Sequence, residues 1–307
     1  MKHLLLKLEV NQMSSKIGVD IGGTKIRLGV ISENRNVLKD ITIPTKLPVY
    51  SYLENEIQKL LVEFPEVNGI GIGTRGMVDH KKGIILYEKE LDGWEGTEVK
   101  SLLEAATNIR VEVNNDANCA ALAEAKLGAG KGFKRVICLT IGTCLGGGFV
   151  FNRKVMNGAH GGAGEVGHLI LYPYGLLCGC GRKGCTEQYV SGTALRRMIA
   201  EKRVIDPVTN ALVTPQQLFR LAANGQQNAV EVRERFLIDL ALVISNLQAV
   251  LDIDCVVIGG GVSESATDWW DLLIDKVNPL KLQPLEIRRA LFGNESGMLG
   301  AALLVGD

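Results

Sequence analysis

The most informative stretch of the chain is Glu165-Val166-Gly167-His168, followed ten residues later by Cys178-Gly179-Cys180-Gly181-Arg182-Lys183-Gly184-Cys185-Thr186-Glu187. Three thiols and one imidazole, from Cys178, Cys180, Cys185 and His168, supply the four ligands of a closed tetrahedral zinc site. Buried thiols or a disulfide pair in a glycine-rich loop are the alternative. A CxCGxxGC pattern with an upstream histidine favours zinc, because it places four ligands within so few residues.

A closed zinc site has no open position at which water is activated. We therefore interpret the metal as a structural clamp that aims Glu165, His168 and Glu187 at a substrate, and we expect the chemistry to lie elsewhere. The other four cysteines are scattered along the chain and are interpreted as reduced thiols of a cytoplasmic protein. They are Cys119, Cys138, Cys144 and Cys255.

Length and composition predict a globular protein of two lobes, because 307 residues that are 46% hydrophobic can bury a sizeable core. Lys plus Arg equal Asp plus Glu at 34 each, so nothing electrostatic favours a nucleic acid or an anionic membrane as partner. No apolar run approaches the roughly 20 residues that span a bilayer, and we expect a cytoplasmic protein whose partner is a small molecule. Met13 is an alternative to Met1 as translation start.

Short β-rich runs and amphipathic helices alternate along the first half of the chain. Residues 16–43 predict an antiparallel meander of three strands. The next predicted elements are a helix capped by Ser51, a strand at 69–73, a helix capped by Thr97, a strand at 109–113 and a helix at 117–127. A second β-rich block at 136–151 restarts the first pattern, which indicates a weak internal duplication.

The second half is predicted to be mainly helical. Thr214-Pro215 opens one helix, and residues 230–251 form a long one. A strand at 255–258 runs into Gly259-Gly260-Gly261, and a final helix covers 298–304. Two α/β lobes with glycine turns that face one another are typical of an enzyme with its site in a cleft.

Three glycine-rich turns predict a nucleotide held across that cleft. In Asp20-Ile21-Gly22-Gly23-Thr24-Lys25 the paired glycines allow positive φ and let backbone N–H groups approach a phosphate. Asp20 suits the Mg²⁺ of a metal–nucleotide complex. The other turns are Gly142-Thr143-Cys144-Leu145-Gly146-Gly147-Gly148 and Gly259 to Gly261; none matches a P-loop or a dinucleotide-binding GxGxxG.

Asn115-Asp116 lies at the C-terminal end of a predicted strand, where α/β enzymes commonly place reacting groups. A carboxylate there can accept the proton of a sugar hydroxyl as it attacks the γ-phosphate of ATP. The alternative is that Asn115 or Asp116 only caps the following helix, and these two residues taken alone favour the cap.

Taken together, these motifs resemble those of the ROK family (repressors, open reading frames and sugar kinases) from about Lys16 to the C-terminus. The zinc tract, DxGGTK at 20–25, NDAN at 115–118 and GTxxGGG at 142–148 carry the resemblance. It implies an actin-like (ribonuclease H-like) two-domain α/β fold with an interdomain cleft. The implied domains are a smaller one at 1–117, on which a helix at about 295–307 packs, and a larger one at 118–294 with the zinc loop.

The resemblance also implies transfer of the ATP γ-phosphate to a sugar, usually at its 6-hydroxyl, by a homodimer. Asp116 would be the general base. Asn115, Glu165, His168 and Glu187 would bind sugar hydroxyls, with His168 holding zinc through its other ring nitrogen, and Gly76 and Met77 would border the sugar near its 2-substituent. The residues that would face ATP and Mg²⁺ are Asp20, Gly22, Gly23, Thr24, Lys25, Gly142, Thr143, Gly259, Gly260 and Gly261.

The chain departs from the family pattern in three places. Cys144 replaces the glycine usual in GTGxGGG, and Arg75 stands where a proline or small residue is more common. Residues 90–94 only partly match the Asn-Leu-x-Gly-Trp of many glucokinase-like members. This partial match speaks against a plain glucokinase, and from the motifs as a whole we predict an ATP-dependent kinase of glucose, N-acetylmannosamine or N-acetylglucosamine.

The alternative is a sugar-sensing member of the same family without kinase activity, either a regulator or a scaffold. Family repressors carry a helix-turn-helix domain ahead of the kinase-like core. Only about fifteen residues precede the core here, which is too few for a three-helix reader of DNA.

Overall fold

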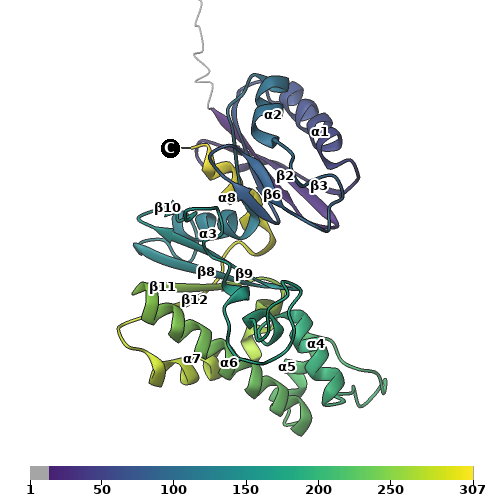
Figure 1. The fold of residues 1–307 in the computed structure, drawn as a ribbon, viewed down its shortest axis with the longest axis vertical. Coiled ribbons are helices and arrows are strands. Elements are labelled where there is room, and N and C mark those ends of the chain that lie inside the picture. The colour runs from purple at the N-terminus through teal and green to yellow at the C-terminus, as the bar shows by residue number, and fades with distance from the viewer. Residues whose placement is uncertain (1–13, 307) are drawn as a thin grey trace, which may run out of the picture.

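The computed structural model describes residues 14–306, which form two lobes stacked along the long axis of the molecule (Figure 1). Each lobe contains a five-stranded mixed sheet, and a two-stranded hairpin accompanies the first. The expected two-lobed α/β fold is confirmed. The alternative start at Met13 lies outside the described residues, and no helix of the described part is long and apolar enough to cross a membrane.

The first sheet has the strand order β3-β2-β1-β4-β7. The predicted meander is confirmed, because β1 (Ser15–Ile21), β2 (Lys25–Ser32) and β3 (Val37–Pro44) pair antiparallel. β4 (Val67–Thr74) runs parallel to β1, and β7 (Val111–Asn115) runs parallel to β4. The remaining elements of this lobe are α1 (Val49–Glu63), α2 (Val99–Thr107), β5 (Met77–Asp79) and β6 (Ile84–Tyr87).

The second sheet has the order β10-β9-β8-β11-β12. Its strands are β8 (Arg135–Ile141), β9 (Leu145–Phe151), β10 (Lys154–Val155), β11 (Cys255–Gly259) and β12 (Glu286–Arg289). Its helices, which cover the lower face in Figure 1, are α4 (Gly192–Glu201), α5 (Pro215–Ala223), α6 (Gln227–Leu251) and α7 (Trp270–Val277). The predicted Thr214-Pro215 start of α5 is a capping box, in which Thr214 and Gln217 satisfy each other's backbone N–H groups.

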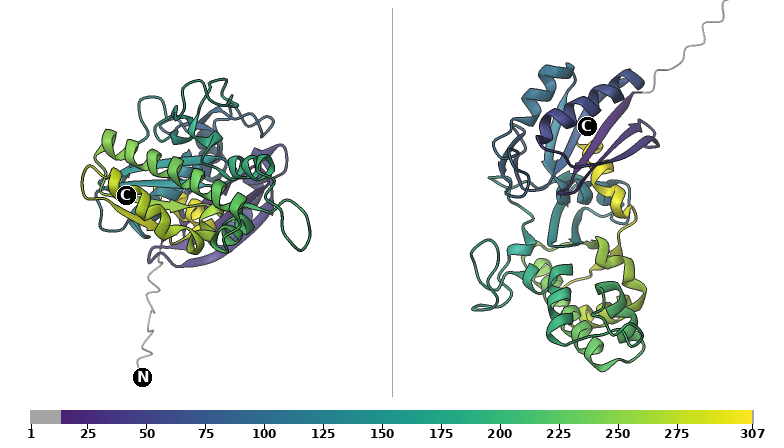
Figure 2. Two further views of the ribbon diagram at one scale, coloured as in Figure 1. Left: turned by 90° about the horizontal axis from the view of Figure 1, so that it is seen from below. Right: turned by 90° about the vertical axis from the view of Figure 1, so that its right-hand side faces the viewer.

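The two sheets repeat one topology, which confirms the internal duplication. Each is an antiparallel meander followed by two parallel strands. The helix after each last strand then crosses to the other lobe: α3 (Asp116–Lys126) packs on β8 and β9, whereas α8 (Ser296–Leu304) packs on β1 and β4. The side view in Figure 2 shows α8, in yellow, between the lobes. The domain boundaries at 117 and 294 stay a prediction.

Close backbone approach fixes α8 between α3 and the first sheet. A Cβ on Gly71 of β4 would collide with the Ala301 carbonyl, and one on Gly18 of β1 would collide with the Met298 carbonyl. A Cβ on Gly300 would collide with the Cys119 carbonyl of α3. These three positions therefore need glycine because there is no room for a side chain.

Two helix starts differ from the prediction. α1 begins at Val49 after Pro48, and Ser51 does not cap it. Val49 is buried, so the apolar face of the helix extends to its first residue. α2 begins at Val99, and the hydroxyl of Thr97 donates instead to the Gly93 carbonyl at 3.3 Å. The sequence prediction also lacked β5, β6, β10, β12, α4 and α7, most of which are short.

The packing of α8 predicts the sign of a stability change. Helix propensity alone makes Gly300→Ala stabilising by about 1 kcal/mol. Because the added methyl group would collide with the α3 backbone, we expect destabilisation by about 1–3 kcal/mol instead. The midpoint of urea unfolding measures this change. Gly306→Ala, just beyond the helix, where an added Cβ would come no closer than 3.8 Å to a neighbour, should change stability by less than about 0.5 kcal/mol. An unchanged or higher midpoint for Gly300→Ala would contradict the packing argument.

Candidate active site and metal cluster

The carboxyl ends of β1, β4 and β7 meet at one edge of the first sheet, because the three strands are parallel. Register places Ile21 beside Thr74 and Thr74 beside Asn115. The residues that follow these strands, Arg75 and Asp116, therefore lie next to the first glycine turn.

A hollow of about 200 Å³ lies between the lobes at this edge. The N-terminal ends of α3 and α8 both reach it, and positive helix ends favour anions such as phosphates. The residues that line it are Asp20, Gly22, Lys25, Arg27, Asp116, Ala117, Ala120, Thr140, Gly260, Gly293, Asn294, Ser296 and Gly297.

The structure distinguishes Asn115 from Asp116 as the cap of the helix that follows β7. The side-chain oxygen of Asn115 accepts the backbone N–H groups of Ala117 at 2.9 Å and Asn118 at 3.3 Å, so Asn115 is the cap of α3. Its amide nitrogen donates to the Gly76 carbonyl at 3.0 Å. Asp116 is the first helical residue, and its carboxylate lines the hollow. The polar ends of Asn115 are thus both used within the protein, and its predicted role as a sugar ligand stays a prediction.

Both carboxylates of the hollow have raised pKa values. Removal from water raises the pKa of Asp116, while the Ala117 N–H group and the Arg75 guanidinium oppose that rise. Burial and the nearby Asp116 carboxylate raise the pKa of Asp20 to about 7, against the pull of Lys25 and Arg27. Two carboxylates among cations can hold a divalent cation together with phosphate oxygens.

The glycine turns of the two lobes do not all reach the hollow. Gly22 lines it from the first lobe and Gly260 from the second. Gly260 has φ +86, and a Cβ there would lie 2.6 Å from the Ile141 backbone, so this approach requires glycine. Of the other predicted nucleotide residues, Asp20 and Lys25 line the hollow, whereas Gly23, Thr24, Gly142, Thr143, Gly259 and Gly261 lie outside its lining.

The turn between β8 and β9 is docked on the start of α4. The Gly142 carbonyl accepts the N–H of Gly192 at 2.7 Å, and the Thr143 carbonyl accepts that of Thr193 at 3.2 Å. Cys144 in this turn does not have a positive φ. The backbone therefore accommodates cysteine where the family pattern has glycine, as expected from the small size of the side chain.

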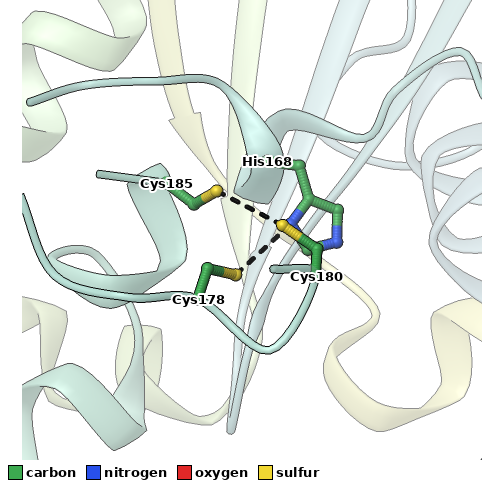
Figure 3. A group of neighbouring side chains, drawn as sticks. All are labelled: His168, Cys178, Cys180 and Cys185. Atoms are coloured by element: carbon green, nitrogen blue, oxygen red, sulfur yellow. Dashed lines mark hydrogen bonds between the residues drawn. The ribbon is translucent and has the colours of Figure 1, made fainter. Parts of the chain in front are cut away.

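Figure 3 shows that His168, Cys178, Cys180 and Cys185 converge. Their ligand atoms all lie within 4.8 Å of one another, with 3.6 Å between the sulfurs of Cys180 and Cys185. The Cys178 sulfur lies 3.8 Å from His168 Nδ1. A tetrahedron with zinc–sulfur bonds of 2.3 Å has edges of about 3.8 Å, so the donor set and its dimensions fit Zn²⁺.

The acidic residues of the zinc tract lie at the edge of this cluster. Glu187 Oε1 accepts the Cys178 thiol at 2.9 Å and lies 3.8 Å from His168 Nδ1. Burial raises the pKa of Glu165; the nearby His168 lowers it, and the charges of Asp116 and Glu187 raise it further. The tract thus brings Glu165 into the electrostatic reach of Asp116, across the cleft from the first lobe.

Sequence reasoning missed several residues of the hollow. Arg27 and Thr140 lie in strands β2 and β8, and Gly293, Asn294, Ser296 and Gly297 lie around the start of α8; no sequence motif singles them out. The internal duplication carries a signal for the last four, because they follow β12 as Asp116 follows β7. A Cβ on Gly297 would lie 2.6 Å from the Asp20 carboxylate, so α8 begins directly against it.

Comparison with known proteins gives one consistent answer. The model of the ROK family matches residues 16–307. Glucokinase of Streptomyces coelicolor is 33% identical, over 94% of this chain and 97% of its own length. N-acetyl-D-glucosamine kinase of Aliivibrio salmonicida is 34% identical over 94% and 98%.

A solved structure agrees with the relatives. The ROK family glucokinase of Streptomyces griseus, in complex with glucose and AMPPNP, is 32% identical and covers 95% of this chain and 99% of its own, with a TM-score of 0.79. The expected actin-like two-domain sugar kinase fold is confirmed.

The environment of Asp20 predicts a pH-dependent stability. Asp20 has a higher pKa in the folded state, about 7, than in the unfolded state, near 3.8. Below pH 3.8 the carboxyl is protonated in both states and does not destabilise the fold, whereas above about pH 7 its burial as a carboxylate is fully unfavourable, so stability falls between these pH values. Without nucleotide or Mg²⁺ at pH 8, the free energy of unfolding of Asp20→Asn should therefore exceed that of the native protein by up to about 4 kcal/mol. Near pH 4 the two proteins should unfold at similar urea concentrations. Asp92→Asn, at an exposed carboxylate, controls for loss of one charge. A difference independent of pH would refute the assignment.

Proposed function

The chain belongs to the ROK family, and we propose that it transfers the γ-phosphoryl group of ATP to the 6-hydroxyl of a hexose or N-acetylhexosamine. The observation that carries this proposal is the position of Asp116. Asn115 is the cap of α3, and the Asp116 side chain, which accepts the Ala117 N–H at 2.8 Å, lines a hollow that glycine turns of both lobes enter.

The proposed chemistry needs one base and several phosphate ligands. Asp116 accepts the proton of the 6-hydroxyl as its oxygen attacks the γ-phosphorus, the bond to the bridging oxygen breaks, and ADP leaves. Lys25, Arg27 and the N-terminal ends of α3 and α8 neutralise phosphate charge. Asp20 would hold Mg²⁺, which would supply further positive charge against the phosphates. A raised pKa suits Asp116 to proton transfer near neutral pH.

The sugar is expected to lie between Asp116 and the zinc tract. Glu165, His168 and Glu187 would accept or donate hydrogen bonds to its hydroxyls, with His168 Nδ1 toward the sulfurs and Nε2 toward the sugar. The proposed Zn²⁺ is structural, because all four positions would be filled by protein. Its role is to hold together a tract whose only helical elements are the 3-10 turns η1 (Val166–His168) and η2 (Thr186–Gln188).

Glucose, N-acetylglucosamine and N-acetylmannosamine are the favoured substrates, since the relatives include kinases named for glucose and for N-acetylglucosamine. These sugars differ at carbon 2, where Gly76 and Met77 would border the ring. Gly76 has φ +89, and a Cβ there would collide with the Tyr87 carbonyl, so the backbone at this point is fixed. We further propose that the protein is a homodimer, as the family resemblance implies. A cytoplasmic location is in accordance with the free thiols of Cys119, Cys138 and Cys255.

The direct test is ADP release from Mg·ATP with glucose, N-acetylglucosamine, N-acetylmannosamine, mannose and fructose. We expect turnover with one of them, and Asp116→Asn should lower kcat by about 100-fold to 10,000-fold while the KM for that sugar changes only a few-fold. Asparagine retains the oxygen that accepts the Ala117 N–H, so the local fold is preserved. Asp92→Asn is the matched control at an exposed site.

Near-normal turnover of Asp116→Asn would remove Asp116 as the base. Sugar binding without turnover across the whole panel, in a folded protein, would instead favour the sugar-sensing alternative.

The zinc site makes a separate prediction. We expect about one zinc per chain by elemental analysis, and Cys180→Ser should lose most of it and weaken sugar binding, because the tract that carries His168 and Glu187 loses its clamp. Cys144→Ser, at the other exposed cysteine, should keep the metal. Full occupancy in Cys180→Ser, or folded active protein without any metal, would contradict the structural role.

A further inference from the structure

Arg75 lies between Asp116, the proposed base, and the glycine turn Asp20–Lys25, which is called the phosphate turn below. Arg75 follows β4, whose last residue, Thr74, pairs with Ile21 on one side and Asn115 on the other. Its backbone N–H donates to the Ile21 carbonyl at 3.4 Å. One residue past this register, Arg75 has the glycine turn on one flank and Asp116 on the other.

The guanidinium group is held from one side by a buried carboxylate. Arg75 Nε lies 3.3 Å from Glu88 Oε2, and the side chain of Glu88 is only 4% exposed. The other oxygen of Glu88 accepts the backbone N–H of Glu90 at 2.7 Å. Beside it, the buried Trp94 donates to the Thr74 hydroxyl at 2.9 Å. The Nε end of Arg75 is thus fixed to a loop that is itself anchored under β4.

The other end of the guanidinium is held only at the surface. Arg75 Nη1 pairs with Glu90 Oε2 at 2.7 Å, but the side chain of Glu90 is 67% exposed. Ion pairs of this kind contribute little because water competes for both groups. The same Nη1 atom lies against Gly23, where an added Cβ would come within 2.6 Å of it. Arg75 Nη1 is therefore a hydrogen-bond donor that can leave Glu90 and that lies against the phosphate turn.

We propose that Arg75 is a further catalytic residue of this chain, which on nucleotide binding exchanges Glu90 for oxygens of the γ-phosphoryl group. The inference rests on the proposed phosphoryl transfer and adds to it a charge that the family pattern lacks, since that pattern has proline or a small residue here. Arginine suits the role because its planar fork binds two phosphate oxygens while Nε stays on Glu88. It remains protonated throughout, and it stabilises the charge that spreads over the transferred oxygens.

The position of Arg75 accounts for both acidic neighbours. Glu88 would keep the guanidinium aimed at the cleft, and Glu90 would hold it in the absence of nucleotide and be displaced by the more highly charged phosphate. Asp116 also faces the guanidinium, whose charge lowers the pKa of that carboxyl. One cation would thus serve the attacking hydroxyl and the group it attacks.

Variants at the three positions test the exchange in opposite directions. Arg75→Met should lower kcat about 100-fold with little change in the KM for the sugar, and Arg75→Lys should recover part of the loss. Glu90→Gln removes the competitor and should lower the KM for ATP a few-fold. Because Arg75→Met leaves Glu88 buried without this partner, the double variant Arg75→Met/Glu88→Gln checks that the loss is not misfolding.

A binding measurement keeps the test independent of turnover. The ratio of AMPPNP affinity to ADP affinity reports contacts to the γ-phosphate, and calorimetry should find it smaller in Arg75→Met and larger in Glu90→Gln. If the native protein binds both nucleotides but turns over no sugar, the proposed function fails while this ratio still tests Arg75. An unchanged ratio and an unchanged kcat in Arg75→Met, or a native protein that binds neither nucleotide, would overturn the inference.

Discussion

The contact of α8 with α3 and with the first sheet is the constraint on which the rest of the structure depends. It is made backbone to backbone, through Gly18, Gly71 and Gly300. Because α8 belongs by sequence to the second sheet and packs on the first, and α3 does the reverse, each lobe is completed by a helix from the other. Both helices begin at the same hollow, so the packing that joins the lobes also points two positive helix ends at one site.

In the proposed function, the residues that would hold the sugar and the residues that would react with it are supported in different ways. The cysteine cluster stabilises a tract with little regular secondary structure, where ordinary packing supplies few constraints. The acidic and cationic groups of the hollow sit instead at the ends of strands and helices, which fix their positions through regular hydrogen bonding. The proposed closed metal site on one side of the cleft and the proposed base on the other are in accordance with this division.

Much of the fold was readable because its signals are local. The alternating apolar residues of β1 and β2, the Thr214-Pro215 cap and the length of α6 each depend on neighbours a few positions away. The predicted start of α1 is three residues too late because a serine is a good cap in isolation, whereas burial of Val49 decides where the helix begins. The short strand β12 lacked a readable pattern, since only pairing with β11 makes its four residues a strand.

The sequence by itself determined the four candidate metal ligands, the glycine turns and the Asn115-Asp116 pair, because each is a set of chemical groups at short spacing along the chain. Only the tertiary structure decided that Asn115 caps α3 while Asp116 is left to face the hollow, and that Arg75 lies between Glu88, Glu90 and the phosphate turn. It also brought the start of α8 against Asp20, more than 270 residues away along the chain. The physical reason is that a side chain's partners depend on strand register and lobe packing, which no spacing within a short segment encodes.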